Sequence, residues 1–146
     1  MEKQEGEKRV PIVEGWFTVK EGKAHLIGNQ CQSCGDYFFP TVYACRNPGC
    51  MSKSLKEVLL GRIGKLWSFT VGYYLPPPPY RPKGTFAPYG LAVVELPREK
   101  IMVLGQVASD IDFGKLKIGM DMEMVLETLQ EDPEGNEVIA WKWRPL

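Results

Sequence analysis

Residues 29–50 read NQCQSCGDYFFPTVYACRNPGC and hold all four cysteines of this 146-residue chain. The thiols form two short turns, Cys31-x2-Cys34 and Cys45-x4-Cys50, with ten residues between them. A glycine follows the first turn and an Asn-Pro-Gly sequence lies inside the second, and both favour a backbone that bends back on itself. Two such pairs of thiolates can complete a tetrahedron around a metal ion. The spacing therefore predicts a metal ribbon whose ligands are Cys31, Cys34, Cys45 and Cys50.

Zinc is the metal that this ligand set predicts. Four thiolates form a closed structural site, which leaves no position for a water molecule or a substrate. Iron is the main rival, because a rubredoxin-type site also uses four thiolates. An iron electron carrier would usually have two matching Cys-x2-Cys turns, whereas the second turn here is longer. Structural zinc is the expected cofactor, and a small iron electron carrier stays open as an alternative.

Composition and charge narrow the cellular setting and the class of partner. The first residues, MEKQEGEKRVP, are charged, and no stretch of about 18 apolar residues occurs. We therefore expect a cytoplasmic protein without a membrane partner, in which clustered cysteines are more often metal ligands than disulfides. Eighteen basic and eighteen acidic residues cancel. This balance argues against bulk binding of nucleic acid, because no positive field attracts a phosphate backbone.

Alternating apolar patterns predict a mainly β fold. Runs at 15–19 and 24–27 flank a Lys-Glu-Gly-Lys turn and predict a hairpin that leads into the cysteines. Further strand patterns, separated by glycine and proline, follow the ribbon. They occupy residues 55–60, 64–74, 86–96, 101–108, 120–129 and 137–143. A connector at 112–119 has room for a single helical turn.

Five or so strands over about ninety residues favour a small closed barrel, and the OB-fold is the natural candidate at this size. The expected organisation is a charged segment (1–14), a rubredoxin-like zinc ribbon entered by a hairpin (15–54) and a five-stranded OB-fold barrel (55–146). A proline-rich stretch, residues 75–85, interrupts the barrel between two strands. Four consecutive prolines favour an extended conformation, which suits either a stiff linker or a binding loop.

The chain resembles the zinc-ribbon OB-fold family of acyl-CoA-associated accessory proteins. The residues that carry this resemblance are the cysteine pattern and the barrel segments KLWSFTVGYY, PPPPYRPKGTFAPYGLAVVEL, VLGQVASDIDFGKLKIGMDMEMVLE and WKWRPL, and it covers residues 15–146. It implies a non-catalytic subunit that docks on a thiolase-type catalytic subunit and helps to bind the CoA moiety. Within the family the chain is most similar to the small zinc-binding subunits of benzoylsuccinyl-CoA thiolases, which implies a role in anaerobic toluene degradation.

The residues themselves favour a subunit that is not catalytic alone. A thiolase needs a cysteine nucleophile and acid/base groups, but the four cysteines are committed to metal and His25 is the single histidine. Nucleotide-binding and nucleophile-elbow motifs do not occur. The residues therefore predict a chain that is not catalytic alone, and the resemblance implies that it is one component of an acyl-CoA acyltransferase (thiolase) complex.

Candidate CoA contacts gather on the strand at 64–74 and on the proline-rich loop. Anionic phosphates of CoA suit Arg or Lys, and its pantetheine arm suits an apolar groove. The expected contacts are Arg81 and Lys83 for phosphate, and Trp67, Phe69, Tyr73 and Phe86 for the groove. The competing interpretation is that Trp67 and Phe69, two positions apart, are barrel core, and that the two cations are solvated loop charges.

A single-stranded nucleic-acid-binding module is the alternative from another class, because a zinc ribbon joined to an OB barrel can also present aromatic side chains to bases. The zero net charge and the acidic residues Asp121, Glu123 and Glu127 oppose it. We therefore expect no nucleic-acid partner.

Overall fold

The structure is a computed structural model that describes residues 9–74 and 87–146. Within these ranges the chain folds into ten strands and one short 3-10 helix. The strands are β1 (Arg9–Pro11), β2 (Phe17–Lys20), β3 (Lys23–Cys31), β4 (Tyr37–Phe38), β5 (Leu55–Leu59), β6 (Ile63–Gly72), β7 (Tyr89–Leu96), β8 (Ile101–Val107), β9 (Asp121–Glu131) and β10 (Glu137–Pro145); the helix is η1 (Phe113–Lys115). The described residues contain no helix that could cross a membrane.

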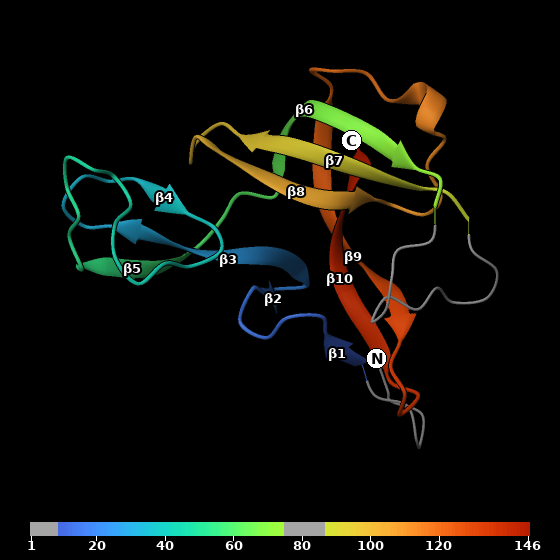
Figure 1. Ribbon diagram of the computed structural model, residues 1–146, viewed down its shortest axis with the longest axis horizontal. Helices are drawn as coiled ribbons and strands as arrows, with labels where there is room; N and C mark the ends of the chain where they lie inside the picture. Colours follow the sequence, from blue (N-terminus) through green and yellow to red (C-terminus); the bar gives the residue numbers. More distant parts are fainter. Residues whose placement is uncertain (1–8, 75–86) are drawn as a thin grey trace.

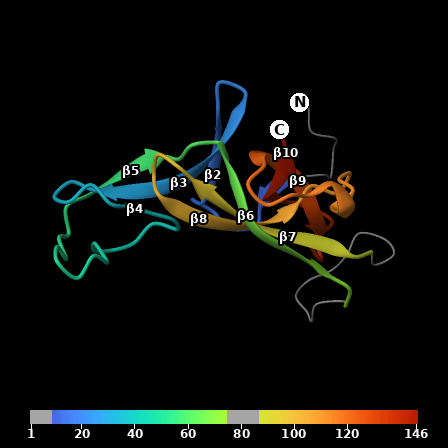
Figure 2. The same ribbon diagram turned by 90° about the horizontal axis from the view of Figure 1, so that it is seen from above.

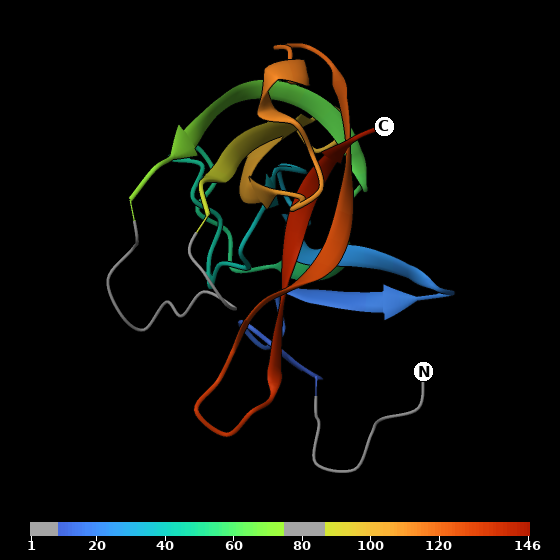
Figure 3. The same cartoon turned by 90° about the vertical axis from the view of Figure 1, so that its right-hand side faces the viewer.

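Five strands close into a barrel, which confirms the predicted OB-fold. Their order is β10-β8-β7-β6-β9, and β9 returns to pair with β10, so the sheet has no open edge at this point. All of these pairs are antiparallel except β10 with β8, which run parallel. The β9–β10 hairpin is longer than the barrel and extends away from it (Figures 1 and 3).

Alternation along the strands creates the barrel core. In β7 every second residue, from Gly90 to Leu96, is buried, and the residues between them face outward. Two fully buried methionines of β9, Met122 and Met124, and the indole of Trp143 on β10 fill the interior. Gly105 of β8 makes room for that indole, since a Cβ there would lie 2.9 Å from Trp143 Cδ1. The two methionines that alternate with acidic residues in the sequence are thus core residues.

The metal ribbon is a second sheet built around β3. The first half of β3 pairs with β2, which confirms the predicted hairpin, and its second half pairs with β4 and β5. This sheet projects to one side of the barrel (Figures 1 and 2). Because β5 pairs with β3, the residues directly after 54 belong to the ribbon sheet. The expected division at 1–14, 15–54 and 55–146 stays a prediction.

Two local elements agree with the predictions from the sequence, and a third element was not predicted. The predicted helical turn is η1, whose N-terminus is capped by the Asp112 carboxylate, which accepts a hydrogen bond of 2.9 Å from Gly114 N. The strand patterns predicted at 120–129 and 137–143 are β9 and β10, which pair as a hairpin. The new element is β1, which lies within the charged segment expected at 1–14 and pairs in parallel with β10. The proline-rich stretch 75–85 lies outside the described residues.

Buried polar contacts fix the junction between ribbon and barrel, residues 59–62. The carboxylate of Glu99, in the β7–β8 turn, is only 4% exposed and accepts hydrogen bonds of 2.7 Å from Gly61 N and from Arg98. Arg62 donates to the carbonyl oxygens of Ala24 on β3 (2.8 Å) and Met124 on β9 (3.2 Å). One side chain therefore joins the ribbon sheet to the barrel.

Aromatic side chains form a second connection between the two sheets. The ring of Trp141 on β10 lies 5.8 Å from Trp16, 5.7 Å from Phe39 and 6.3 Å from Phe17, measured between centroids. The first two rings also contact each other edge to face. Trp141 Nε1 donates to Leu104 O at 3.0 Å, so its polar end is satisfied. The two C-terminal tryptophans thus have separate positions, since Trp143 lies in the core and Trp141 in this aromatic cluster.

We predict that Glu99→Ala lowers the free energy of unfolding by about 1–3 kcal/mol, because it leaves the Gly61 amide without its acceptor. Glu99→Gln keeps an acceptor oxygen and should lower the free energy of unfolding by a smaller amount. Glu134→Ala, in the exposed β9–β10 turn, is the control and should be neutral. Urea unfolding followed by tryptophan fluorescence measures all three. Equal stability of wild type and Glu99→Ala would contradict the assigned role of this carboxylate.

Candidate functional site

The two cysteine turns are shaped by backbone hydrogen bonds that the local sequence dictates. In the first turn Gly35 N donates to Cys31 O at 3.0 Å, and Gly35 has a φ of 85°, which favours glycine. In the second, Cys50 N donates to Asn47 O at 2.9 Å, and the Asn47 side chain accepts from Gly49 N at 3.0 Å. Each turn therefore presents its two sulfurs to the same side.

The four sulfurs meet at one point in space. The Sγ atoms of Cys31, Cys34, Cys45 and Cys50 all lie within 4.8 Å of one another. The separations are 3.6 Å between Cys31 and Cys50 and 3.5 Å between Cys34 and Cys45. These distances exceed the roughly 2.05 Å of a disulfide, and they match the edge of a tetrahedron of about 3.8 Å that Zn–S bonds of about 2.3 Å produce. The donor set therefore fits a tetrathiolate metal site.

Backbone hydrogen bonds and burial shift the pKa values of three thiols, Cys31, Cys45 and Cys50, in different directions. The backbone amide of Cys34 donates to Cys31 and lowers the pKa of that thiol to about 6, although burial opposes the shift. Burial raises the pKa of the Cys45 thiol to about 12. The Ser52 amide favours the Cys50 thiolate, but burial and the neighbouring thiols outweigh it and raise the pKa of Cys50. A bound dication favours the thiolate form of all four, because it supplies the positive charge that the site itself lacks.

The expected CoA contacts are dispersed. Trp67 is 57% exposed and Tyr73 is 74% exposed, whereas Phe69 packs against the barrel core. Trp67 and Phe69 do not share a face as the strand spacing suggested, because the register of β6 against β7 shifts between Leu66 and Ser68. The remaining expected contacts, Arg81, Lys83 and Phe86, lie outside the described residues.

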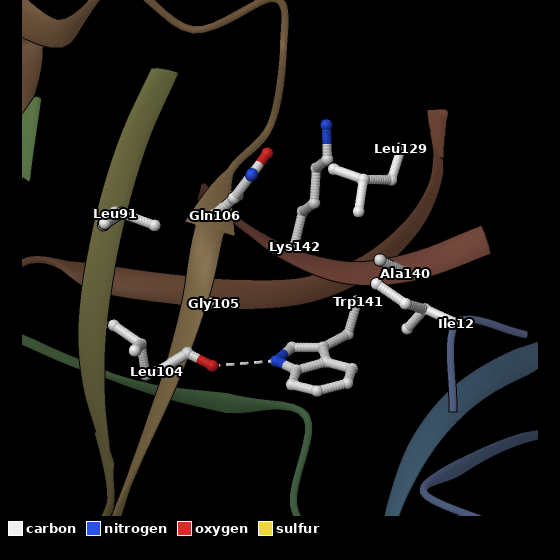
Figure 4. A pocket seen from close by; sticks show the side chains of 9 residues that line it. All are labelled: Ile12, Leu91, Leu104, Gly105, Gln106, Leu129, Ala140, Trp141 and Lys142. Carbon is white, nitrogen blue, oxygen red and sulfur yellow. Dashed lines mark hydrogen bonds between the residues drawn. The ribbon is translucent and has the colours of Figure 1, made fainter. Parts of the chain in front are cut away.

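A groove on the outer surface of the barrel is a feature that the sequence did not indicate. It has a volume of about 220 Å³ and lies where β10 leaves β8 (Figure 4). Most of its lining is apolar, and the residues come from four strands and the segment after β1. They are Ile12, Leu91, Leu104, Gly105, Gln106, Leu129, Ala140, Trp141 and Lys142. Because these residues are far apart in the chain, only the strand register brings them together.

Lys142 is the one cation in this groove lining, and it has a partner. Its side chain is 8% exposed, and its Nζ lies 3.3 Å from Glu127 Oε1 on β9. The same carboxylate oxygen accepts a hydrogen bond from Ser109 N at 3.2 Å. The ammonium charge is thus compensated within the protein.

A second, more polar cavity of about 450 Å³ separates the first cysteine turn from the β7–β8 turn. Cys34 and Asp36 line its ribbon side, and Arg98, Glu99 and Lys100 line its barrel side. Charges of both signs surround it, so it has no clear preference for an ion of one sign. It also places the exposed Cys34 close to the junction between the two sheets.

Comparison with known proteins gives consistent matches over most of the chain. Residues 57–127 match the family described as "ChsH2, C-terminal OB-fold domain". A "DUF35 domain-containing scaffold protein" of Methanocaldococcus jannaschii is 31% identical over 137 residues, 92% of this chain and 91% of that protein. The "Benzoylsuccinyl-CoA thiolase subunit BbsA" of Thauera aromatica is 27% identical, over 86% of this chain and 81% of that subunit.

A solved structure gives the same result in three dimensions. The structure titled "Ltp2-ChsH2(DUF35) aldolase" contains a chain that superimposes with a TM-score of 0.63 and 26% sequence identity. The match covers 83% of this chain and 84% of that one, which is more than the barrel alone. From the sequence identity, its extent and the shared fold, this chain belongs to the DUF35 family of zinc-ribbon and OB-fold proteins.

Proposed function

We propose that this protein is a non-catalytic accessory subunit that docks on a thiolase-type catalytic subunit. The observation that carries the proposal is the similarity over most of the chain to a protein named as a thiolase subunit. The structural similarity to a chain of the Ltp2-ChsH2(DUF35) aldolase supports it, because that protein's name also joins DUF35 to an enzyme. The cysteine geometry supports the non-catalytic part: a site closed by four protein ligands keeps no position for a substrate.

Zinc, in this proposal, is the structural cofactor held by Cys31, Cys34, Cys45 and Cys50. The metal would supply folding free energy, since each turn contains few apolar residues that could stabilise it by burial. The ribbon then acts as a folded peg that fixes the barrel against the partner. The chain itself binds the catalytic subunit and orients the barrel against it, and the partner provides the nucleophile and the acid/base groups.

A finer part of the proposal concerns the ligand. We propose that the barrel helps to hold the CoA moiety of the substrate. In this proposal Arg81 and Lys83 lie near the phosphates, and Trp67, Tyr73 and Phe86 lie near the pantetheine arm. Phe69 was expected there too, but it packs against the core and therefore supports the neighbouring residues. The exposure of the Trp67 and Tyr73 side chains is compatible with contact to a ligand. The name of the Thauera aromatica relative suggests benzoylsuccinyl-CoA as the substrate of the complex, in anaerobic toluene degradation.

We predict that the purified wild-type protein contains a single zinc ion per chain and that Cys45→Ser loses both the metal and the ability to assemble with the catalytic subunit. Ser33→Ala, which removes a hydroxyl group between the two ligands of the first turn, is the control and should keep both. Plasma mass spectrometry measures the metal, and size-exclusion chromatography follows assembly. Visible absorption typical of a ferric tetrathiolate would contradict zinc as the metal. Normal assembly of the metal-free variant would contradict the role of the folded ribbon in docking.

Purification from the native host at high salt should recover a thiolase-type catalytic subunit together with this chain. An interface built on apolar burial survives added salt, whereas binding to a phosphate backbone weakens steeply. Mass spectrometry of the retained proteins identifies the partner. Recovery of the chain alone, or with nucleic acid that added salt removes, would contradict the proposal and favour the nucleic-acid-binding alternative.

Replacing both Arg81 and Lys83 by Ala should weaken binding of coenzyme A to the assembled complex about tenfold or more, because two charge-assisted contacts to phosphate are lost. The matched control replaces Lys115 and Lys117, two exposed lysines of the connector, by Ala. Isothermal titration of each complex with coenzyme A gives the affinities. An unchanged affinity of the Arg81/Lys83 variant would move the CoA site to other residues.

A further inference from the structure

The middle of the outer surface of β7 and β8, between the polar residues Glu95 and Gln106, is apolar where a solvated strand pair would be polar. We name four side chains the aliphatic face: Leu91 and Val93 on β7, and Met102 and Leu104 on β8. Val93 pairs directly with Leu104, so the face is continuous across the two strands. Leu104 is 57% exposed and Met102 is 43% exposed. Antiparallel sheets with one wet side normally alternate apolar and polar residues, so this exposure needs an explanation.

The aliphatic face continues into the groove beside β10. Leu91 and Leu104 belong to both, and Figure 4 shows them on the opposite side of the groove from Ile12 and Ala140. Trp67, which is 57% exposed, follows on the other side, since its neighbour Ser68 pairs with Val93. An apolar surface with a concave end and an exposed tryptophan has the composition of a protein interface core.

Charge decides which kind of occupant fits. Lys142 in the groove is compensated by Glu127. Lys65, on the rim, forms an ion pair with Asp121 and stands opposite Glu95. Among the described residues around the face, these cations therefore have carboxylate partners. An anionic ligand would have to displace an existing ion pair, whereas an uncharged apolar segment would not.

The position of the face within the barrel points to binding as well. In OB-folds the surface of the second and third barrel strands is where oligonucleotides and oligosaccharides bind, and β7 and β8 are the second and third strands of this barrel. Single-stranded nucleic acid requires a basic groove and stacked aromatic rings. The aliphatic face provides leucine, valine and methionine at this position. The aliphatic face therefore occupies the position of the ligand-binding surface of other OB-folds, but its side chains are those of a protein–protein interface.

We infer that the aliphatic face and the adjoining groove bind an uncharged, apolar segment of the catalytic subunit. This inference rests on the proposed function, which names the partner but not the surface. Leu104 lies at the centre, because it belongs to both the face and the groove. Met102 flanks it on one side, and Trp67 on the other side marks the border with the residues proposed to contact CoA. The paired charges of Lys142 and Lys65 form a neutral rim.

The test uses the full-length protein and the catalytic subunit recovered from the host by the high-salt purification. Leu104→Glu and Met102→Glu each place a charge in the face, and Ile118→Glu is the matched control. Ile118 is 62% exposed in the connector after η1, so it is a similar change outside the face. Binding is measured by isothermal titration, and thermal unfolding of each free variant checks that it is folded.

We expect Leu104→Glu to weaken binding of the catalytic subunit at least 100-fold, Met102→Glu to weaken it by about tenfold, and Ile118→Glu to bind like wild type. Wild-type affinity of both face variants would overturn the inference while the proposed function stands. Failure of the wild type to bind any thiolase-type subunit would overturn both. Self-association of the wild type that Leu104→Glu abolishes, or binding of a single-stranded oligonucleotide that it abolishes, would overturn the inference in favour of a second copy or of nucleic acid.

Discussion

Burial of the apolar side chains of β10 is the constraint on which the rest of this structure depends. Trp143 fills the barrel, and replacing a buried tryptophan by alanine typically costs about 3–5 kcal/mol. Two residues earlier, Trp141 packs against aromatic side chains of the ribbon sheet. The same strand pairs with β1, β8 and β9. Barrel closure, attachment of the ribbon and the groove therefore share one strand.

The parts of the fold that depend on local sequence could be predicted, and the parts that depend on register could not. The cysteine cluster followed from spacing, since each pair of ligands lies within one turn of chain. The barrel strands followed from alternation. By contrast, the β6 bulge turns Trp67 outward and Phe69 inward, and no pattern within the strand signals it. Glu99 is a single acidic residue in a turn, and only the fold shows that it caps the junction 38 residues away.

In the proposed function, the metal site and the docking surface are separate parts of the molecule. The four thiols gather in a closed cluster, so a metal there would hold the ribbon together and take no part in a reaction. The aliphatic face lies on the barrel, on strands whose inner faces belong to the core. Strands fixed in this way present a surface with little freedom to rearrange. This arrangement is the one expected of a protein that positions another macromolecule.

The hydrogen bonds of Arg62 and Glu99 also have a consequence for avidity. They act together with the aromatic cluster, so the ribbon and the barrel keep a fixed spacing and orientation. A partner that contacts both sheets finds the second contact surface already positioned when the first contact forms. The entropic cost of ordering the two surfaces relative to each other is therefore part of folding and not of binding. A flexible linker at residues 59–62 would forfeit this advantage even if every contacting side chain were kept. The junction therefore fixes the distance between the ribbon sheet and the barrel. Its stiffness sets the effective concentration of a contact on one of them once the other is bound.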